Sequence, residues 1–187
     1  MLAAGINSAT QAALDALILP GSQFTTGYSY GPQSGAVSST AATQSQLHAY
    51  PLIINKSSQA FDRIGITVST GAASSTVRLG IYNDSSALPG TVLLDAGTID
   101  ASTTGDKTIT ITQTLTRGRW WIVGVAQGGA PTLNTVTGVN PHVGKPTAGA
   151  SGHNIAYHVT GVTGALPSPF GTPADCNFAL RVFLRAA

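Results

Sequence analysis

Apolar residues recur at every second position in several stretches of this chain, and this alternation limits its fold more than any other feature. The pattern covers residues 61–69, 76–83 and 106–113. Successive side chains of a strand point to opposite faces, so each stretch is predicted to be a strand with one buried face. Residues 119–127, RWWIVGVAQ, are apolar on both faces, which indicates a central strand or one covered by another chain. Residues 177–185 are predicted to form the last strand.

The composition agrees with strands rather than helices. All seven acidic residues are Asp, only 9% of residues are charged, and 22 Gly and 10 Pro are present. Short Gly, Pro, Asp and Ser turns join the predicted strands, which favours an all-β fold, an antiparallel two-sheet sandwich of jelly-roll type over residues 46–187. Long loops separate two further strands, expected near 132–137 and 155–160.

The first 45 residues follow a different pattern. Residues 8–19 place Leu14, Leu17 and Ile18 at helical spacing and predict a short amphipathic helix before Pro20. Residues 20–45 are rich in Gly, Ser and Thr and also contain three aromatic side chains. They form either a loop held by its own aromatic contacts or an extended arm on a neighbouring subunit. Residues 1–45 are therefore predicted to anchor the protein, with assembly contacts at Leu14, Leu17, Ile18, Phe24, Tyr28 and Tyr30.

The charge distribution argues against several classes of partner. Nine scattered Lys and Arg residues give a net charge of +2 and no basic run, so nucleic-acid binding is not expected. No apolar stretch approaches the roughly 20 residues that a membrane-spanning helix needs. The first residues lack a basic segment, so a signal peptide is not expected either.

The sequence contains no recognisable catalytic motif. It has no G-x-S-x-G, H-E-x-x-H or phosphate-binding loop, so we predict neither an enzyme nor a cofactor. Cys176 is expected to pack as a small apolar residue, with a catalytic thiol as the alternative. His142, His153 and His158 suggest a metal site, but five residues separate the last two, which places them on opposite faces of a regular strand. No metal is predicted.

The remaining candidates for chemistry are turn acids and aromatic side chains. Asp84, Asp95, Asp100 and Asp106 lie in or beside predicted turns, where Asp commonly caps the chain; calcium binding at Asp84 is the alternative. Trp120 and Trp121 should face opposite sides of a strand. The outer Trp would form a sugar platform with Tyr82, or would be buried against the arm or a neighbouring subunit. The candidate ligand-binding residues are Trp120, Tyr82 and Arg78.

Three stretches together resemble a known family. They read LHAYPLIINKSSQAFDRIGITVST, VRLGIYNDSSALPGTVLLDAGTID and KTITITQTLTRGRWWIVGVAQ. Their order is similar to that of a β-sandwich module of bacteriophage virion proteins, chiefly tail-fibre and minor tail proteins, and the similarity covers residues 46–127. The family's structural positions fall on Tyr50-Pro51, Ile64 to Val68, Arg78 to Tyr82, Leu88-Pro89-Gly90 and Gly118 to Val123.

The resemblance implies a setting more than a chemistry. It predicts a structural protein on the exterior of a phage virion, a projecting tail-fibre or minor tail component that contacts the host surface, including its glycans. Other virion proteins and two further copies, as a homotrimer, are the expected partners. The alternatives are a capsid decoration protein (head fibre or cement) and a carbohydrate-binding module. Within the module, residues 82–90, YNDSSALPG, are predicted to be a loop between strands.

Overall fold

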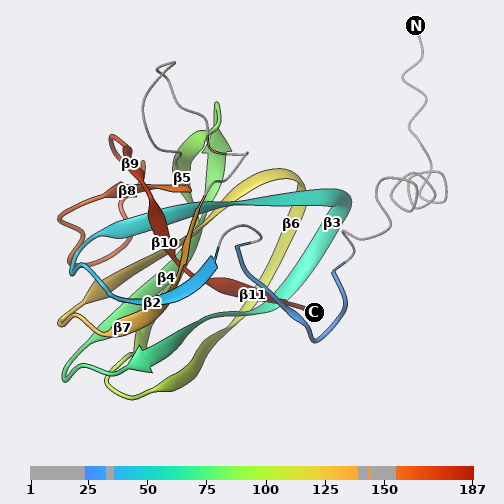
Figure 1. Cartoon of the computed structure of the whole chain (residues 1–187). Coiled ribbons are helices and arrows are strands. Elements are labelled where there is room, and N and C mark those ends of the chain that lie inside the picture. Colours follow the sequence, from blue (N-terminus) through green and yellow to red (C-terminus); the bar gives the residue numbers. More distant parts are fainter. Residues whose placement is uncertain (1–23, 33–35, 139–142, 144–154) are drawn as a thin grey trace, which may run out of the picture.

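The computed structural model describes residues 24–32, 36–138, 143 and 155–187, and within these ranges the chain is all-β with no helix (Figure 1). The helix predicted over residues 8–19, with Leu14, Leu17 and Ile18, lies outside the described residues. In the described part no helix is long and apolar enough to cross a membrane. The strands are β1 Ser29–Tyr30, β2 Ala36–Ala41, β3 Leu47–Thr70, β4 Thr76–Ser85, β5 Leu88–Asp100, β6 Gly105–Gln127, β7 Thr132–Thr137, β8 Ala156–Val159, β9 Ala174–Cys176, β10 Phe178–Leu180 and β11 Phe183–Ala186.

All strand pairs are antiparallel and join into one sheet of 11 strands. Its main path runs β1-β11-β3-β6-β4-β5, while β7 pairs with β2, β3 and β10, and β8 pairs with β3 and β9. The prediction of an antiparallel all-β fold is confirmed. The pairing connects all of these strands, where the sequence had suggested two separate sheets.

The long antiparallel pair of β3 and β6 forms the centre of the sheet. The two strands pair from Leu47 opposite Val125 to Val68 opposite Gly105. Their register shifts twice, between Ile54 and Ser58 and again after Phe61, and Figure 1 shows both strands bending along their length. Such irregularities bend a strand and increase its twist, which allows one ribbon to face more than one layer of side chains.

The central strands β3, β4 and β6 bury side chains on both faces. One face belongs to a larger core that also takes residues from β7, β10 and β11, including Leu79, Ile81, Ile122, Leu133, Leu180 and Leu184. The opposite face belongs to a smaller core made of Leu47, Ala49, Tyr82, Trp121, Val123, Val125, Val143, Tyr157, Val162, Leu166 and Phe170. The two-sided apolar pattern of residues 119–127 therefore marks a central strand, as predicted.

The described part of the segment predicted as an anchoring arm belongs to the sheet. Strand β1 pairs with β11, and β2 pairs with β7 along its whole length. Phe24 packs edge-on against Phe61 and Tyr30, so these two arm aromatics face their own subunit. Tyr28 differs, because it is 65% exposed. Two of the three aromatics thus fit the loop interpretation, and Tyr28 stays available to a partner.

The stretch 82–90 is shorter as a loop than predicted. Strands β4 and β5 continue into it until Ser85 faces Leu88. Only Ser86 and Ala87 form the turn, with φ of 51° and 69°, the two positive values that a type I′ hairpin turn requires. Asp84 Oδ2 accepts a hydrogen bond from the Ala87 N–H at 3.2 Å, which confirms its role in capping the turn.

Candidate functional site

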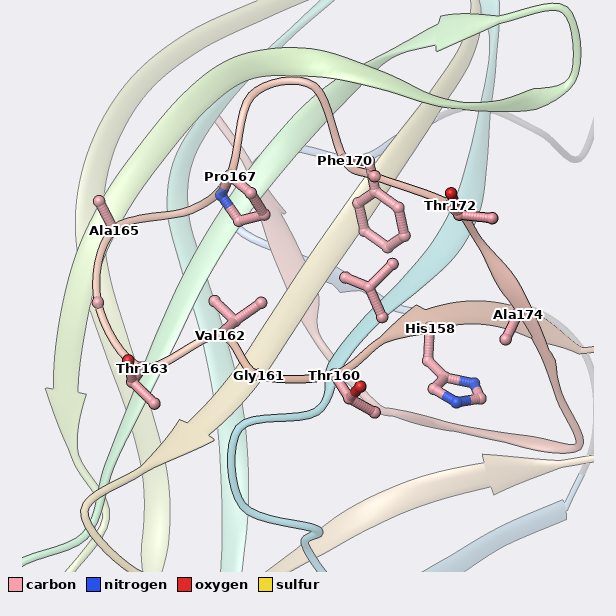
Figure 2. Close-up of a pocket in the computed structure, with 13 residues that line it drawn as sticks. His158, Thr160, Gly161, Val162, Thr163, Ala165, Pro167, Phe170, Thr172 and Ala174 are labelled. Carbon is pink, nitrogen blue, oxygen red and sulfur yellow. The ribbon is translucent and has the colours of Figure 1, made fainter.

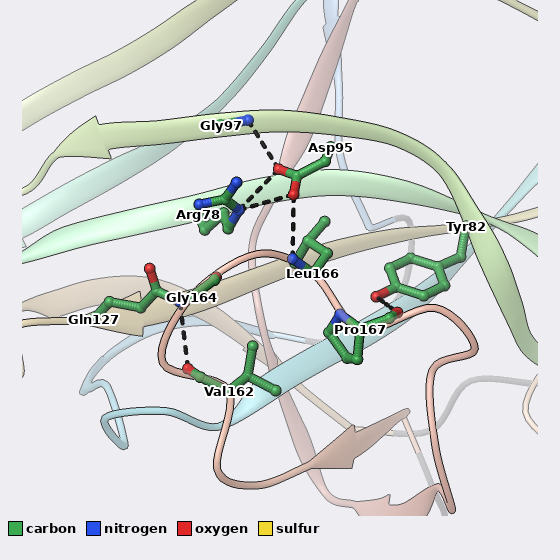
Figure 3. Close-up of polar contacts among 9 residues, drawn as sticks. All are labelled: Arg78, Tyr82, Asp95, Gly97, Gln127, Val162, Gly164, Leu166 and Pro167. Atoms are coloured by element: carbon green, nitrogen blue, oxygen red, sulfur yellow. Dashed lines mark hydrogen bonds and ion pairs between the residues drawn. The ribbon is translucent and has the colours of Figure 1, made fainter.

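A loop of residues 160–173, between β8 and β9, lies across the outer side of the smaller core. Leu166 and Phe170 are buried beneath it, whereas most of its Gly, Ala and Thr residues are exposed. Side chains and backbone groups of distant strands hold this loop, which we call the 160–173 loop (Figure 3). Binding residues often lie on loops that a rigid scaffold positions, so this segment is the candidate functional site.

Asp95 on β5 connects the loop to the sheet. Its Oδ2 accepts a hydrogen bond from the Leu166 N–H at 3.1 Å, and its Oδ1 accepts one from the Gly97 N–H at 3.1 Å. Arg78 Nε on β4 donates to both carboxylate oxygens at 2.9 Å. Arg78, predicted as a ligand-binding residue, is thus engaged in an internal ion pair that positions the loop (Figure 3).

Tyr82 on β4 makes a second attachment. Its side chain is fully buried, its hydroxyl donates to the Pro167 carbonyl at 2.6 Å, and its ring meets the edge of Phe170. Burial and the nearby Asp95 carboxylate raise the pKa of Tyr82, so the hydroxyl keeps its proton. The predicted sugar platform is not assembled, because Tyr82 has no exposed face.

Backbone hydrogen bonds fix the rest of the loop. The Val162 N–H donates to the Ser45 carbonyl at 3.0 Å and the Phe170 N–H to the Gly90 carbonyl at 2.9 Å. Gln127 Nε2 donates to the Val162 and Gly164 carbonyls at 3.3 and 2.9 Å. Together with those of Asp95 and Tyr82, these contacts start from β4, β5, β6 and the turn at Ser45, so the loop is held along its length rather than only at its ends.

The two adjacent tryptophans lie on opposite faces, as predicted. Trp121 sits opposite Tyr82 in the strand register and is fully buried, with its Nε1–H donated to Asp84 Oδ1 at 2.9 Å. Trp120 is half-buried against the larger core, and its Nε1–H donates to the Thr116 carbonyl at 2.9 Å. The structure therefore does not bring Trp120 and Tyr82 together on one surface.

The 160–173 loop and the ends of β8 and β9 border a cavity of about 610 Å³ (Figure 2). The described part of its lining contains no Asp, Glu, Lys or Arg. The residues that line it are His158, Val159, Thr160, Gly161, Val162, Thr163, Gly164, Ala165, Pro167, Phe170, Gly171, Thr172 and Ala174. The volume falls within the range of small-molecule sites, and a lining of apolar side chains with a few hydroxyls is typical of them.

Two histidines face each other where β3 pairs with β8, at the end of this cavity. His48 and His158 are direct partners in register, with ring centroids 6.1 Å apart. Cys176 Sγ lies 3.6 Å from His48 Nδ1. Burial, with a smaller contribution from His158, lowers the pKa of His48 to about 4. The same desolvation raises the pKa of the Cys176 thiol, which packs in the larger core as predicted.

The structure also locates the other predicted metal and turn residues. His142 and His153 lie outside the described residues, and within the described ranges no three His, Cys, Asp or Glu side chains are grouped as metal ligands. Asp100 accepts from the Ser102 N–H at 3.1 Å, as expected for a turn. Asp106 instead accepts from the Thr67 hydroxyl at 2.6 Å.

The sequence analysis missed the acceptor and donor that matter most to the loop, Asp95 and Gln127. Asp95 was interpreted as a turn residue, although it lies within β5 and opposite Gly80. One signal was available: Arg78 and Asp95 flank the loop predicted at residues 82–90, and antiparallel pairing of the strands on either side of it brings such opposite charges within reach.

Replacing Asp95 by Ala is expected to release the loop. The change leaves Arg78 and the Leu166 N–H without their acceptor, and hydrogen bonds to a charged group contribute about 2 kcal/mol to the free energy of unfolding. Urea unfolding should show a loss of this size, and amide exchange at Leu166 should accelerate. Asp106→Ala, at an exposed carboxylate, is the control and should change the stability by less than about 0.5 kcal/mol. Equal effects of the two changes would contradict this role.

Gly80 is needed where the loop approaches the sheet. A Cβ at this position would clash with the Leu166 side chain and with the Leu94 carbonyl oxygen. Because the carbonyl belongs to the paired strand, Gly80→Ala is expected to cost about 1–3 kcal/mol in urea unfolding. Gly164→Ala is the matched control, since a Cβ there meets no atom within 4 Å. A Gly80→Ala protein as stable as Gly164→Ala would show that the loop does not pack this closely.

Comparisons with known proteins bear on the fold alone. No family model matches the sequence, and no curated protein matches it. A structure of the clostridial cysteine protease Cwp84 after propeptide cleavage is 15% identical, with a TM-score of 0.50, over 86% of this chain and 40% of that one. A second, of the cysteine protease and lectin-like domains of Cwp84, a surface-layer associated protein of Clostridium difficile, is 14% identical, with a TM-score of 0.47, over 76% of this chain and 33% of that one. The chain thus spans less than half of either structure.

Proposed function

We propose that this chain is a structural protein on the exterior of a bacteriophage virion, a projecting tail-fibre or minor tail component whose 160–173 loop contacts the host surface. The observation that carries the contact role is the attachment of this exposed loop to the sheet by Asp95, Tyr82 and Gln127. A loop held in this way displays a fixed surface on a rigid body, as recognition requires. The virion setting rests on the sequence resemblance over residues 46–127.

The proposal includes a layered, jelly-roll-like body and a homotrimer. Two apolar cores on opposite sides of β3, β4 and β6 support a layered body. Exposed apolar side chains ahead of β3 support assembly, because Tyr28 is 65% and Val37 is 58% exposed. Subunit contacts commonly cover such residues. Sedimentation equilibrium of the purified chain is expected to give a trimer that Tyr28→Ala weakens, and a monomer at all concentrations would contradict this part.

Quantitative mass spectrometry of purified particles tests the virion role. Particles from cells that produce this chain are expected to contain it at a copy number far below that of the major capsid protein, as befits the tail. A copy number that is a simple fraction of the number of capsid subunits would instead identify the chain as a decoration protein of the capsid shell. Absence of the chain from washed particles would overturn the proposal.

A further inference from the structure

We propose that the cavity bordered by residues 158–174 binds an uncharged, hydroxyl-rich ligand, a unit of a neutral glycan. This inference rests on the proposed function, in which the 160–173 loop contacts the host surface. It names the chemical class of ligand that the loop contacts. It also places the sugar site at the cavity instead of at the predicted platform of Trp120 and Tyr82.

The described polar side chains of the cavity are the hydroxyls of three threonines and the imidazole of His158. The hydroxyls of Thr160, Thr163 and Thr172 belong to exposed residues, and a hydroxyl both donates and accepts hydrogen bonds. Among the described lining residues there is no Asp, Glu, Lys or Arg. Asp175, exposed directly after the lining residue Ala174, adds a negative charge nearby. A carboxylate, sulfate or phosphate would lose hydration here beside the Asp175 carboxylate, and would meet no Lys or Arg among the described lining residues.

The apolar part of the lining lies on the concave side of the loop. Figure 2 shows Val162, Pro167 and Phe170 pointing inward, with Thr160, Thr172 and His158 around them. A pyranose ring has C–H groups on its faces and hydroxyls around its edge. Val162 and Phe170 are buried, so the half-buried Val159 and Pro167 supply the apolar surface that a ligand reaches, beside the exposed threonine hydroxyls. A neutral sugar meets both kinds of surface at once.

The attachment of the loop to the sheet lowers the conformational-entropy cost of binding a ligand. The N–H groups of Val162, Leu166 and Phe170 already donate to Ser45, Asp95 and Gly90. The loop therefore needs little ordering when a ligand arrives, and less of the interaction free energy is lost to conformational entropy.

An NMR titration of the isotope-labelled full chain tests the assignment. The probes are galactose, glucose and N-acetylglucosamine, with N-acetylneuraminic acid and glucose 6-phosphate as charged counterparts. At least one neutral sugar is expected to shift amide signals of residues 155–176 saturably, with a millimolar Kd that is typical of a single sugar unit. The charged counterparts are expected to bind at least about tenfold more weakly, because the described lining offers no Lys or Arg and the Asp175 carboxylate lies nearby.

Two tryptophan variants localise the binding. Ala174→Trp, at an exposed lining position that is the strand partner of His158, fills the cavity and should raise the Kd at least about tenfold. Thr110→Trp places the same side chain at an exposed position of β6 outside the cavity and should leave the Kd unchanged. Amide spectra of both variants report directly whether they fold.

Three results would overturn the inference: no shift with any neutral sugar, tighter binding of the charged counterparts, or binding that Ala174→Trp leaves unchanged. Failure here and failure of the virion role are distinguishable. Particles that contain the chain while no sugar binds would remove only the glycan assignment. Sugar binding at the cavity with no chain in the particles would remove the virion role and leave a carbohydrate-binding module.

Discussion

Replacing Trp121 by Ala is expected to lower the free energy of unfolding by about 3–5 kcal/mol, the usual cost of deleting a buried aromatic side chain. The indole is fully buried in the smaller core, with its ring 5.5 Å from that of Tyr157. The change leaves a cavity between β6 and β8 and removes the donor to Asp84 Oδ1. Urea unfolding followed by circular dichroism measures the loss.

The neighbouring Trp120 supplies a matched control. It is half-buried, so Trp120→Ala is expected to cost only about 1–2 kcal/mol. Should Trp121→Ala fail to fold, Trp121→Phe keeps most of the ring and loses the Nε1–H, with an expected loss of about 1–2 kcal/mol. A larger effect of Trp120→Ala than of Trp121→Ala would contradict the assignment of the two side chains to their faces.

Acid is expected to destabilise the protein through His48. The pKa of His48 is about 4 in the folded chain and 6.5 when the side chain is free, so the unfolded chain binds more protons between these values. Stability therefore falls as the pH falls through this interval, by about 2.5 kcal/mol between about pH 7 and pH 4.5. The cause is the burial of His48 beside His158, Cys176 and Phe178, none of which is an anion.

His48→Phe tests this origin of the pH dependence. Phe keeps an aromatic ring between β8 and β10 but does not titrate, so the stability of the variant should vary much less between about pH 7 and pH 4.5. The midpoints of urea unfolding at several pH values are compared between the unchanged protein, His48→Phe and His158→Phe. His158→Phe is the control, because His158 is less buried than His48. An unchanged pH dependence in His48→Phe would assign the acid sensitivity to other groups.

Alternation of apolar residues predicted the strands well, because successive side chains of a strand point to opposite faces of the sheet and apolar residues mark the face that is buried. The stretches 61–69, 76–83 and 106–113 lie within β3, β4 and β6, and the strands expected near 132–137 and 155–160 are β7 and β8. Strand β2 was not predicted. It is held by hydroxyl contacts, as in Ser38 to Thr135 at 3.0 Å, and leaves Val37 exposed, so it has no apolar face to detect.

The site was predicted only in part, because its contacts join distant parts of the chain. Arg78 and Tyr82 were predicted to bind a ligand, and in the structure their side chains instead hold the loop through Asp95 and Pro167. The Leu166 contact of Asp95 spans 71 residues, and the Pro167 contact of Tyr82 spans 85. Local patterns carry no information on which strand a Gly- and Pro-rich loop will cover, so neither the loop attachment nor the cavity followed from the sequence.

Hydrogen exchange of the full chain tests the central claim, that the 160–173 loop is a fixed part of the sheet and so displays a defined surface. The amides of Val162, Leu166 and Phe170 each have an acceptor outside the loop. We predict that they exchange as slowly as amides of β4, because they are released only when the sheet opens. Exchange of these three amides at the rate of an unprotected chain, with β4 still protected, would contradict the account.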